Sequence, residues 1–306
     1  MMRAKHTLFI LIAVLLTVAV LEIGIRIFEN RLSGNLNHIN QIPNIAAEYE
    51  QHQGTNILFL GNSLINEAVD IDQLDRELSN DYLVKKITPD GTSLWDWNMI
   101  LRNNLITPDM QLDYLVIGFA WGLLNDDYRP NPSRLGGYFS GIGDGLLLFD
   151  YGMSDFAELS EFVIGWTSKL FVNREAVRNK ILNNLVPHYE QFVQAQNQAG
   201  APVEAGDQTQ AEELFPDYRM LNDLIDQLDQ RGIKLIMIAM PIEGAYSVNQ
   251  ELRETLQKRA YLYKDYRENF RSSGAIYKDG VHFNEKGREQ FTATLGRLIN
   301  QELSGQ

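Results

Sequence analysis

The first apolar segment of the chain is long enough to cross a lipid bilayer. An uncharged run extends from Thr7 to Leu21, and the segment stays mostly apolar up to Phe28. A helix of this length can span a membrane if Glu22 and Arg26 lie near one interface. A cleaved signal peptide is the alternative, but no small-x-small cleavage site follows the apolar run. The sequence therefore predicts a membrane anchor over residues 1–29.

Beyond the anchor, the pattern changes at about residue 54. Residues 30–53 are polar and irregular apart from one short helical stretch, and we expect a stalk there. After the stalk, short apolar runs rich in β-branched and aromatic residues predict strands at 56–61, 82–88, 113–120 and 234–241. Segments with helical spacing lie between them, at 70–78, 94–105 and 216–232, and Gly232 is a C-terminal cap. This alternation predicts an α/β domain over 54–303, with a parallel sheet covered by helices on both faces.

One segment interrupts the alternation of strands and helices. Residues 131–215 contain a glycine-rich loop, helical stretches and the polar run QAQNQAGAPVEAGDQTQAEE. We expect a helical insertion with a flexible polar end. The apolar residues of 146–172 could cover the strand ends as a lid, although packing against the core is the simpler interpretation.

Composition excludes several classes of function. The net charge of −13 is spread over the chain, which disfavours binding to nucleic acid. The absence of cysteine excludes disulfide frameworks, thiolate zinc sites and cysteine nucleophiles. The sequence has no phosphate-binding loop, no G-x-G-x-x-G and no His/carboxylate cluster at metal-ligand spacing, so we expect no cofactor and no metal.

Ser63, in ILFLGNSLINEAVD, directly follows the first predicted strand. Ligands of open parallel sheets bind at the carboxyl ends of the strands, but serine there is also a common turn or capping residue. A serine nucleophile needs a base, and four of the five histidines lie in the anchor, the stalk or the insertion. His282 remains, and Asp279 precedes it by three residues in YKDGVHFNEKG. An aspartate at this spacing can orient the imidazole and stabilise its charged form; the alternative is that both residues only cap the next helix.

That next helix is predicted from an apolar stripe. Asn284 is its candidate N-cap. The stripe that would dock it on the core consists of Phe291, Leu295, Leu298 and Ile299.

The segments GNSL and DGVHFNEKG together resemble the first and last blocks of the SGNH (GDSL) family of serine esterases and acyltransferases. The resemblance covers about 54–130 and 216–303. It implies a flavodoxin-like fold, in which a parallel sheet is the middle of three layers. It also implies that Ser63 is the nucleophile and that His282 and Asp279 complete a catalytic triad.

The family's middle blocks imply an oxyanion hole. Its donors would be the Ser63 N–H and Gly91, which lies in TPDGTS at the place of the second block. The third block normally carries an asparagine, but GFAWGLLNDD has Ala120 at the matching position. Asn125 is the nearest candidate donor, with a turn-forming role as its alternative, and the Trp121 N–H is another candidate.

A single anchor and a GNS-type first block resemble bacterial proteins that add or remove acyl groups on exported polysaccharides. The resemblance implies a single-pass membrane esterase or O-acyltransferase for O-acetyl groups. Its catalytic domain would lie in the periplasm or at the cell surface. The expected partners are an acylated carbohydrate or other ester and a membrane acyl-donor protein. The alternative is a non-catalytic, membrane-anchored glycan-binding or assembly subunit, which the departure at Ala120 favours.

Overall fold

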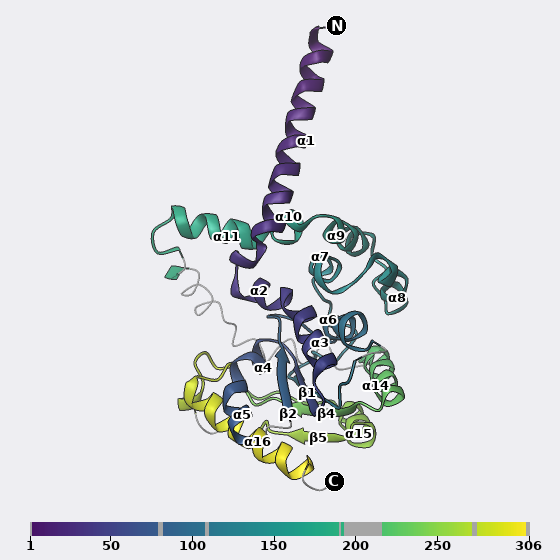
Figure 1. Ribbon diagram of the computed structural model, residues 1–306, viewed down its shortest axis with the longest axis vertical. Helices are drawn as coiled ribbons and strands as arrows, with labels where there is room; N and C mark the ends of the chain where they lie inside the picture. The colour runs from purple at the N-terminus through teal and green to yellow at the C-terminus, as the bar shows by residue number, and fades with distance from the viewer. Residues whose placement is uncertain are drawn as a thin grey trace. The chain divides into compact units, whose positions relative to one another are not determined.

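The chain forms two units in the computed structural model (Figure 1), which describes residues 2–78, 82–107, 110–189, 191–192, 216–270 and 274–303. The first unit joins Met1–Asn40 with Asn131–Val193, and the second joins Gln41–Pro130 with Gln194–Gln306. The whole polar run of the predicted insertion, 194–213, lies outside the described residues.

The second unit contains a five-stranded parallel sheet in the order β2-β1-β3-β4-β5. Its strands are β1 (Thr55–Leu60), β2 (Tyr82–Ile87), β3 (Tyr114–Phe119), β4 (Lys234–Ala239) and β5 (Leu262–Asp265). This is the flavodoxin-like order, in which the chain reverses direction across the sheet between β1 and β3. The predicted fold class and all four predicted strands are confirmed. The fifth strand was not predicted, because its four residues are only half-buried and form no apolar run.

Helices flank this sheet in two groups. The helices of the second unit are α3 (Ile42–Gln51), α4 (Ser63–Ala68), α5 (Ile71–Glu77), α6 (Leu94–Ile100), α14 (Arg219–Arg231), α15 (Gln250–Arg259) and α16 (Glu285–Leu303). The helices α4, α5 and α16 pack together, as do α6 and α14. Every residue of β3 is buried, as expected for a central strand covered on both faces.

Two predicted helix ends are confirmed in detail. Helix α14 ends at Gly232, which has the left-handed conformation of a C-terminal cap, with φ of 70°. Helix α16 begins after Asn284, whose side-chain oxygen accepts a hydrogen bond from the Gly287 N–H at 3.1 Å. Its predicted apolar stripe is buried, at Phe291, Leu295, Leu298 and Ile299.

Residues 30–53 differ from the irregular stalk that the sequence predicts. They contain the helices α2 (Gly34–Asn40) and α3 (Ile42–Gln51), after the short turn η1 (Glu29–Arg31). Ile42, Ile45 and Tyr49 are buried at helical spacing, and the Tyr49 hydroxyl donates to the Ile57 carbonyl of β1 at 2.8 Å. The many polar residues between these positions obscured an amphipathic pattern.

The first unit consists of helices and helical turns. They are α1 (Met2–Phe28), α2, α7 (Pro132–Arg134), η3 (Leu135–Phe139), η4 (Ile142–Asp144), α8 (Gly145–Asp150), α9 (Phe156–Thr167), α10 (Lys169–Val172) and α11 (Arg174–Leu185). Among the described residues, one helix is long and apolar enough to cross a membrane: Lys5–Arg31 has a mean hydropathy of 2.9 and none of its most apolar stretch is buried. Residues 131–192, the described part of the predicted insertion, belong to the same unit as the N-terminal helix.

Candidate active site

Ser63 is the first residue of α4, at the carboxyl end of β1. The preceding Asn62 caps this helix: its side-chain oxygen accepts a hydrogen bond from the Leu64 N–H at 3.0 Å. The Asn62 side-chain N–H donates to the Thr92 carbonyl at 3.0 Å, which links the β1–α4 junction to the loop after β2. The capping role that the sequence left open for Ser63 is thus performed by its neighbour.

Close packing beneath α4 sets the position of Ser63. A side chain at Gly118 of β3 would collide with Ile65 of α4, so the glycine lets this helix approach the sheet. The Gly61 carbonyl accepts hydrogen bonds from the Thr92 hydroxyl and from the Trp97 indole N–H, each at 3.0 Å. These buried contacts support the backbone on both sides of Ser63.

His282 and Asp279 lie in a tight turn before α16. The Asp279 carboxylate accepts hydrogen bonds from the His282 backbone N–H at 2.8 Å and from the Val281 N–H at 3.2 Å. The same carboxylate lies 2.9 Å from Nδ1 of the His282 ring. Gly280, between them, has φ of 77°, a conformation that residues with a Cβ rarely adopt. The turn therefore fixes the imidazole through one carboxylate.

An aromatic cluster holds this turn on the core. Tyr277 and Phe283 pair as an isolated antiparallel bridge, and their rings stack with centroids 4.9 Å apart. Phe283 also packs against Phe291 of α16, with centroids 5.5 Å apart. The Lys278 N–H donates to the His282 carbonyl at 2.9 Å. His282 is thus mounted on buried side chains rather than on a free loop.

The structure brings the three predicted triad residues together. Nε2 of His282 lies 2.9 Å from the Ser63 hydroxyl oxygen, across 219 positions of sequence. With the contact between Nδ1 and Asp279, a continuous hydrogen-bonded chain runs from the Ser63 hydroxyl to the Asp279 carboxylate. The His282 side chain is 24% exposed, so it can meet a ligand from solvent. In this arrangement the imidazole can accept the hydroxyl proton while the carboxylate stabilises the resulting charge.

The charge of Asp279 suits this role. Partial burial by itself would raise the pKa of this carboxyl. The hydrogen bonds from the His282 backbone and ring and from the Val281 N–H outweigh burial and hold the pKa below its usual value. The carboxylate is therefore ionised at neutral pH.

Two of the predicted oxyanion-hole donors, Ser63 and Gly91, lie in segments that the Asn62 side chain links. Within the described residues the Ser63 N–H has no hydrogen-bond partner, as expected at the first position of a helix. Gly91 lies one residue before Thr92, whose carbonyl binds the Asn62 side chain, and its φ of 62° orients the loop after β2. Each residue is thus one position away from a partner of the Asn62–Thr92 hydrogen bond, which joins the start of α4 to the loop after β2.

Asn125 is a predicted oxyanion donor through its side-chain N–H, whereas its side-chain oxygen supports a turn. Its side-chain oxygen accepts hydrogen bonds from the Asp127 N–H at 3.0 Å and the Asp217 N–H at 3.3 Å, which is the turn-forming alternative. In this turn Asn125 and Asp126 are buried, whereas Asp127 and Tyr128 are exposed. Burial raises the pKa of the Asp126 carboxyl to about 6, even though its oxygen accepts the Met220 N–H at the start of α14.

Trp121 follows β3, the neighbour of the strand that leads to Ser63. It has φ of 47°, which is rare for a residue with a side chain, and its ring lies 6.0 Å from that of Tyr246. Its indole N–H is buried and has no partner among the described residues. A buried N–H without a partner costs about 1–3 kcal/mol, so an acyl oxygen that accepted a hydrogen bond from Trp121 would recover that cost.

If the Trp121 indole N–H is the third oxyanion donor, Trp121→Phe should lower kcat for ester hydrolysis about 10²–10³-fold, the usual effect of removing one such donor. The thermal unfolding temperature should not fall, because the variant loses an unpaired N–H and keeps an aromatic ring. Trp166→Phe, at an exposed position of the first unit, is the matched control. An unchanged kcat in Trp121→Phe would remove Trp121 from the set of donors.

Two contacts of the triad turn were not predicted. Lys278 forms an ion pair with Glu67 of α4 at 3.1 Å, which joins the segment of His282 to the helix of Ser63. The Glu243 N–H, in the loop after β4, donates to the Gly280 carbonyl at 2.9 Å. Neither pair leaves a signal in the sequence, because the partners are far apart and each residue alone is an ordinary surface residue.

No group of three or more His, Asp or Glu side chains among the described residues could hold a metal ion. A cavity of about 480 Å³ lies at the amino ends of the strands, next to Gly54, Asp113 and Ile233. Since Ser63 follows the carboxyl end of β1, this cavity is at the opposite edge of the sheet from the candidate triad.

No protein-family model and no curated protein matches the chain. Two solved structures have some similarity to it. A candidate acylhydrolase from Bacteroides fragilis has a TM-score of 0.39 and 12% identity, over 84% of this chain and 95% of that one. An acetylxylan esterase from Geobacillus stearothermophilus has a TM-score of 0.38 and 11% identity, over 82% of this chain and 96% of that one. The fold assignment above rests on the strand order of the sheet itself.

Proposed function

We propose that this chain is a serine-dependent enzyme that acts on esters, with Ser63 as nucleophile, His282 as general base and Asp279 as the residue that orients the imidazole. The observation that carries the proposal is the hydrogen-bonded chain from the Ser63 hydroxyl through both ring nitrogens of His282 to Asp279. The resemblance of GNSL and DGVHFNEKG to the SGNH family supports the same roles.

The chemistry follows the order of these contacts. The Ser63 oxygen attacks the acyl carbon while Nε2 of His282 takes the hydroxyl proton. The N–H groups of Ser63 and Gly91 would stabilise the oxyanion that forms. Collapse of this intermediate breaks the ester bond, the leaving alcohol takes the proton from His282, and an acyl-serine remains. Water or a sugar hydroxyl then attacks the acyl-serine by the same steps in reverse, which defines an esterase or an acyltransferase.

The substrate class we propose is an O-acylated, foremost O-acetylated, polysaccharide outside the cytoplasm. Its support is the family resemblance of the serine segment together with the apolar helix Lys5–Arg31, which would hold the enzyme at the membrane. In this proposal the N-terminus is cytoplasmic, and a membrane acyl-donor protein supplies the acyl group for transfer.

The acceptor that takes the acyl group from the acyl-serine, a sugar or water, distinguishes transfer from hydrolysis. The full chain in detergent should release p-nitrophenol from p-nitrophenyl acetate, and the Ser63→Ala variant should not. An acyltransferase should also form O-acetyl sugar when oligosaccharide is added, with a matching fall in free acetate, whereas an esterase should release all of the acetyl group as acetate. Release of p-nitrophenol at equal rates by the parent chain and by Ser63→Ala would contradict both forms of the proposal.

Topology has its own test. A reporter that is active only in the cytoplasm, fused after residue 306, should be silent when the chain is produced in bacteria with its N-terminal helix intact. An active reporter would place the second unit in the cytoplasm and would contradict the extracytoplasmic location.

A non-catalytic, membrane-anchored glycan-binding subunit is the second candidate. Ala120 at the position of the family's asparagine favours it. This candidate predicts glycan binding that survives Ser63→Ala unchanged, together with no ester hydrolysis by the parent chain.

A further inference from the structure

Helix α9 of the first unit carries an uncharged apolar face that is exposed to solvent. Phe156 is 85% exposed, and Val163, Ile164 and Trp166 are each exposed by more than 40%. At about 100° per residue these four positions fall within one half of the helix surface. Gly165 lies on the opposite side, where an added Cβ would collide with the Ser133 carbonyl of α7. The half that carries Phe156 therefore points away from the interior of this unit, and we call these four side chains the α9 face.

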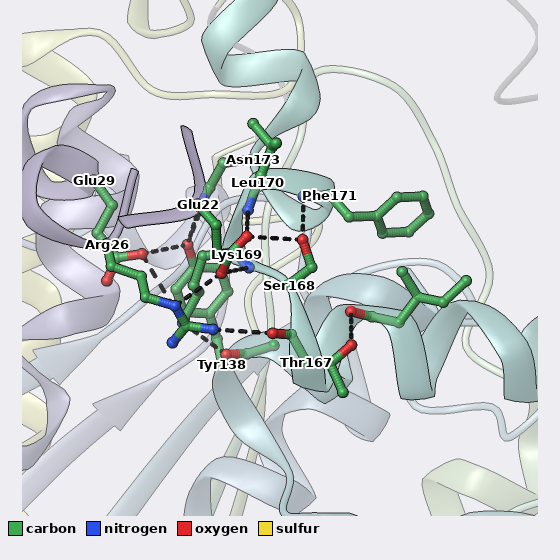
Figure 2. Close-up of polar contacts among 12 residues, drawn as sticks. Glu22, Arg26, Glu29, Tyr138, Thr167, Ser168, Lys169, Leu170, Phe171 and Asn173 are labelled. Carbon is green, nitrogen blue, oxygen red and sulfur yellow. Dashed lines mark hydrogen bonds and ion pairs between the residues drawn. The ribbon is translucent and has the colours of Figure 1, made fainter. Parts of the chain in front are cut away.

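Polar contacts fix where α9 meets α1. The Arg26 guanidinium donates to the Thr167 carbonyl, the last residue of α9, at 2.9 Å. The Glu22 carboxylate accepts hydrogen bonds from the Ser168 hydroxyl and from the Lys169 and Leu170 N–H groups, at 2.9, 2.9 and 3.0 Å. Figure 2 shows these bonds gathered around Glu22 and Arg26, which also pair with each other at 2.8 Å.

A second set of contacts secures the same junction. Lys169 lies over the Tyr138 ring, 3.5 Å from its centroid, and donates to the Gly137 carbonyl at 2.7 Å. The Tyr138 hydroxyl bonds to Glu29 at 3.2 Å and to Asn173 at 2.9 Å (Figure 2). The last turns of α1 and the following turn η1 are thus held to the start of α10, from Glu22 to Glu29. In Figure 1, α9 and α10 accordingly lie at the level of the lower end of α1.

If α1 spans a bilayer, the end of α1 that contacts α9 and α10 lies at one edge of the hydrocarbon layer. A core of about 30 Å is crossed by about 20 helical residues. A span that begins at Thr7, directly after Lys5 and His6, therefore ends close to Arg26. Because Arg26 bonds to Thr167, the end of α9 lies at the membrane–water interface. Trp166, one residue earlier, is of the type enriched at that depth.

The hydrogen bonds of Glu22 lower the free-energy cost of placing its carboxylate at the edge of the hydrocarbon layer. An unpaired carboxylate at the edge of the hydrocarbon layer is costly, but Glu22 accepts hydrogen bonds from four different groups. Acidic residues outnumber basic ones in 131–192, so attraction to anionic lipid does not favour membrane contact. Burial of the α9 face is the remaining driving force, at about 25 cal/mol per Å² of apolar surface.

We propose that the α9 face lies in the lipid interface beside α1, so that the first unit is a membrane-docked platform rather than a solvated insertion. The inference rests on the proposed membrane anchor, because α1 must span the bilayer for α9 to reach this depth. In this proposal lipid acyl chains cover the α9 face. The face is thereby excluded as a lid over the strand ends.

Single-cysteine labelling tests this proposal cleanly, because the chain has no cysteine of its own. Phe156→Cys, Val163→Cys and Trp166→Cys would each carry an environment-sensitive fluorophore in the full chain, reconstituted in zwitterionic nanodiscs. Val14→Cys in α1 is the lipid reference, and Gln257→Cys on α15 is the water reference. All five side chains are exposed, and thermal unfolding of each variant checks that it is folded.

We expect blue-shifted emission at 156, 163 and 166, and loss of emission when lipids with a quencher near the headgroup replace ordinary lipids. The quenching should be closer to that at Val14 than to that at Gln257, and added salt should not change it. Labels on α9 that behave like Gln257 while Val14 is quenched would overturn the α9 proposal and leave the anchor standing. An unquenched label at Val14 would overturn the anchor and the α9 proposal with it.

Discussion

Ser63→Ala is expected to abolish ester hydrolysis, with a fall in kcat of roughly 10⁶-fold, because no other group can form the acyl intermediate. His282→Ala should cause a loss of similar size, since the hydroxyl that it contacts at 2.9 Å would have no base. The two residues act as one unit, so the double variant should be little slower than either single variant. Initial rates with p-nitrophenyl acetate measure all three losses.

Folding is the control for these variants. Within the described residues the Ser63 hydroxyl hydrogen-bonds only to His282, and Asn62 caps α4, so Ser63→Ala should unfold at nearly the temperature of the parent chain. A Ser63→Ala variant with parental rates would contradict the nucleophile assignment. Losses that multiply in the double variant would show that the two residues act independently.

Asp279→Asn should have the second largest effect, a loss of about 10⁴-fold in kcat. The asparagine oxygen can still accept the backbone N–H groups of Val281 and His282, so the turn should survive while the charge partner of the imidazole is lost. Glu67→Gln is the matched control: it removes the pair with Lys278, and exposed pairs contribute only about 0–1 kcal/mol. A kcat for Asp279→Asn as high as that for Glu67→Gln would contradict the orienting role.

The pH dependence of stability gives Asp279 a second readout. Its pKa is depressed in the folded state, so its contribution is complete above the unfolded value of about 3.9 and is lost as pH falls through the folded value. The difference in unfolding temperature between the parent chain and Asp279→Asn should therefore be constant near neutral pH and shrink below about pH 4. A difference that grows in acid would contradict the depressed pKa.

The sheet and the triad turn could be predicted because their signals are local. The central strands are continuous apolar runs, and Asp279 and His282 are three residues apart, so one turn determines their contact. The contact from His282 to Ser63 spans 219 positions. It could be expected only because parallel strands bring the segments that follow them to one edge of the sheet.

Other parts of the molecule could not be predicted because they depend on tertiary packing. The helices in 30–53 have few apolar residues, and their burial depends on partners elsewhere, such as the Ile57 carbonyl that binds Tyr49. The turn that Asn125 supports could not be predicted in full, because the Asp217 N–H that its side-chain oxygen accepts is distant in sequence. The segment after Asn131 contacts the N-terminal helix through Glu22 and Arg26. In the sequence these two residues are only charges that flank an apolar run, so their contacts could not be predicted.

The central claim is that Ser63 is an activated nucleophile, and a fluorophosphonate probe tests it most directly because the probe reacts covalently only with such a serine. The purified full chain should gain the mass of one probe, located on the peptide that contains Ser63. The Ser63→Ala variant should gain none, and His282→Ala should react far more slowly than the parent chain. A folded parent chain that stays unlabelled at Ser63 would contradict the account.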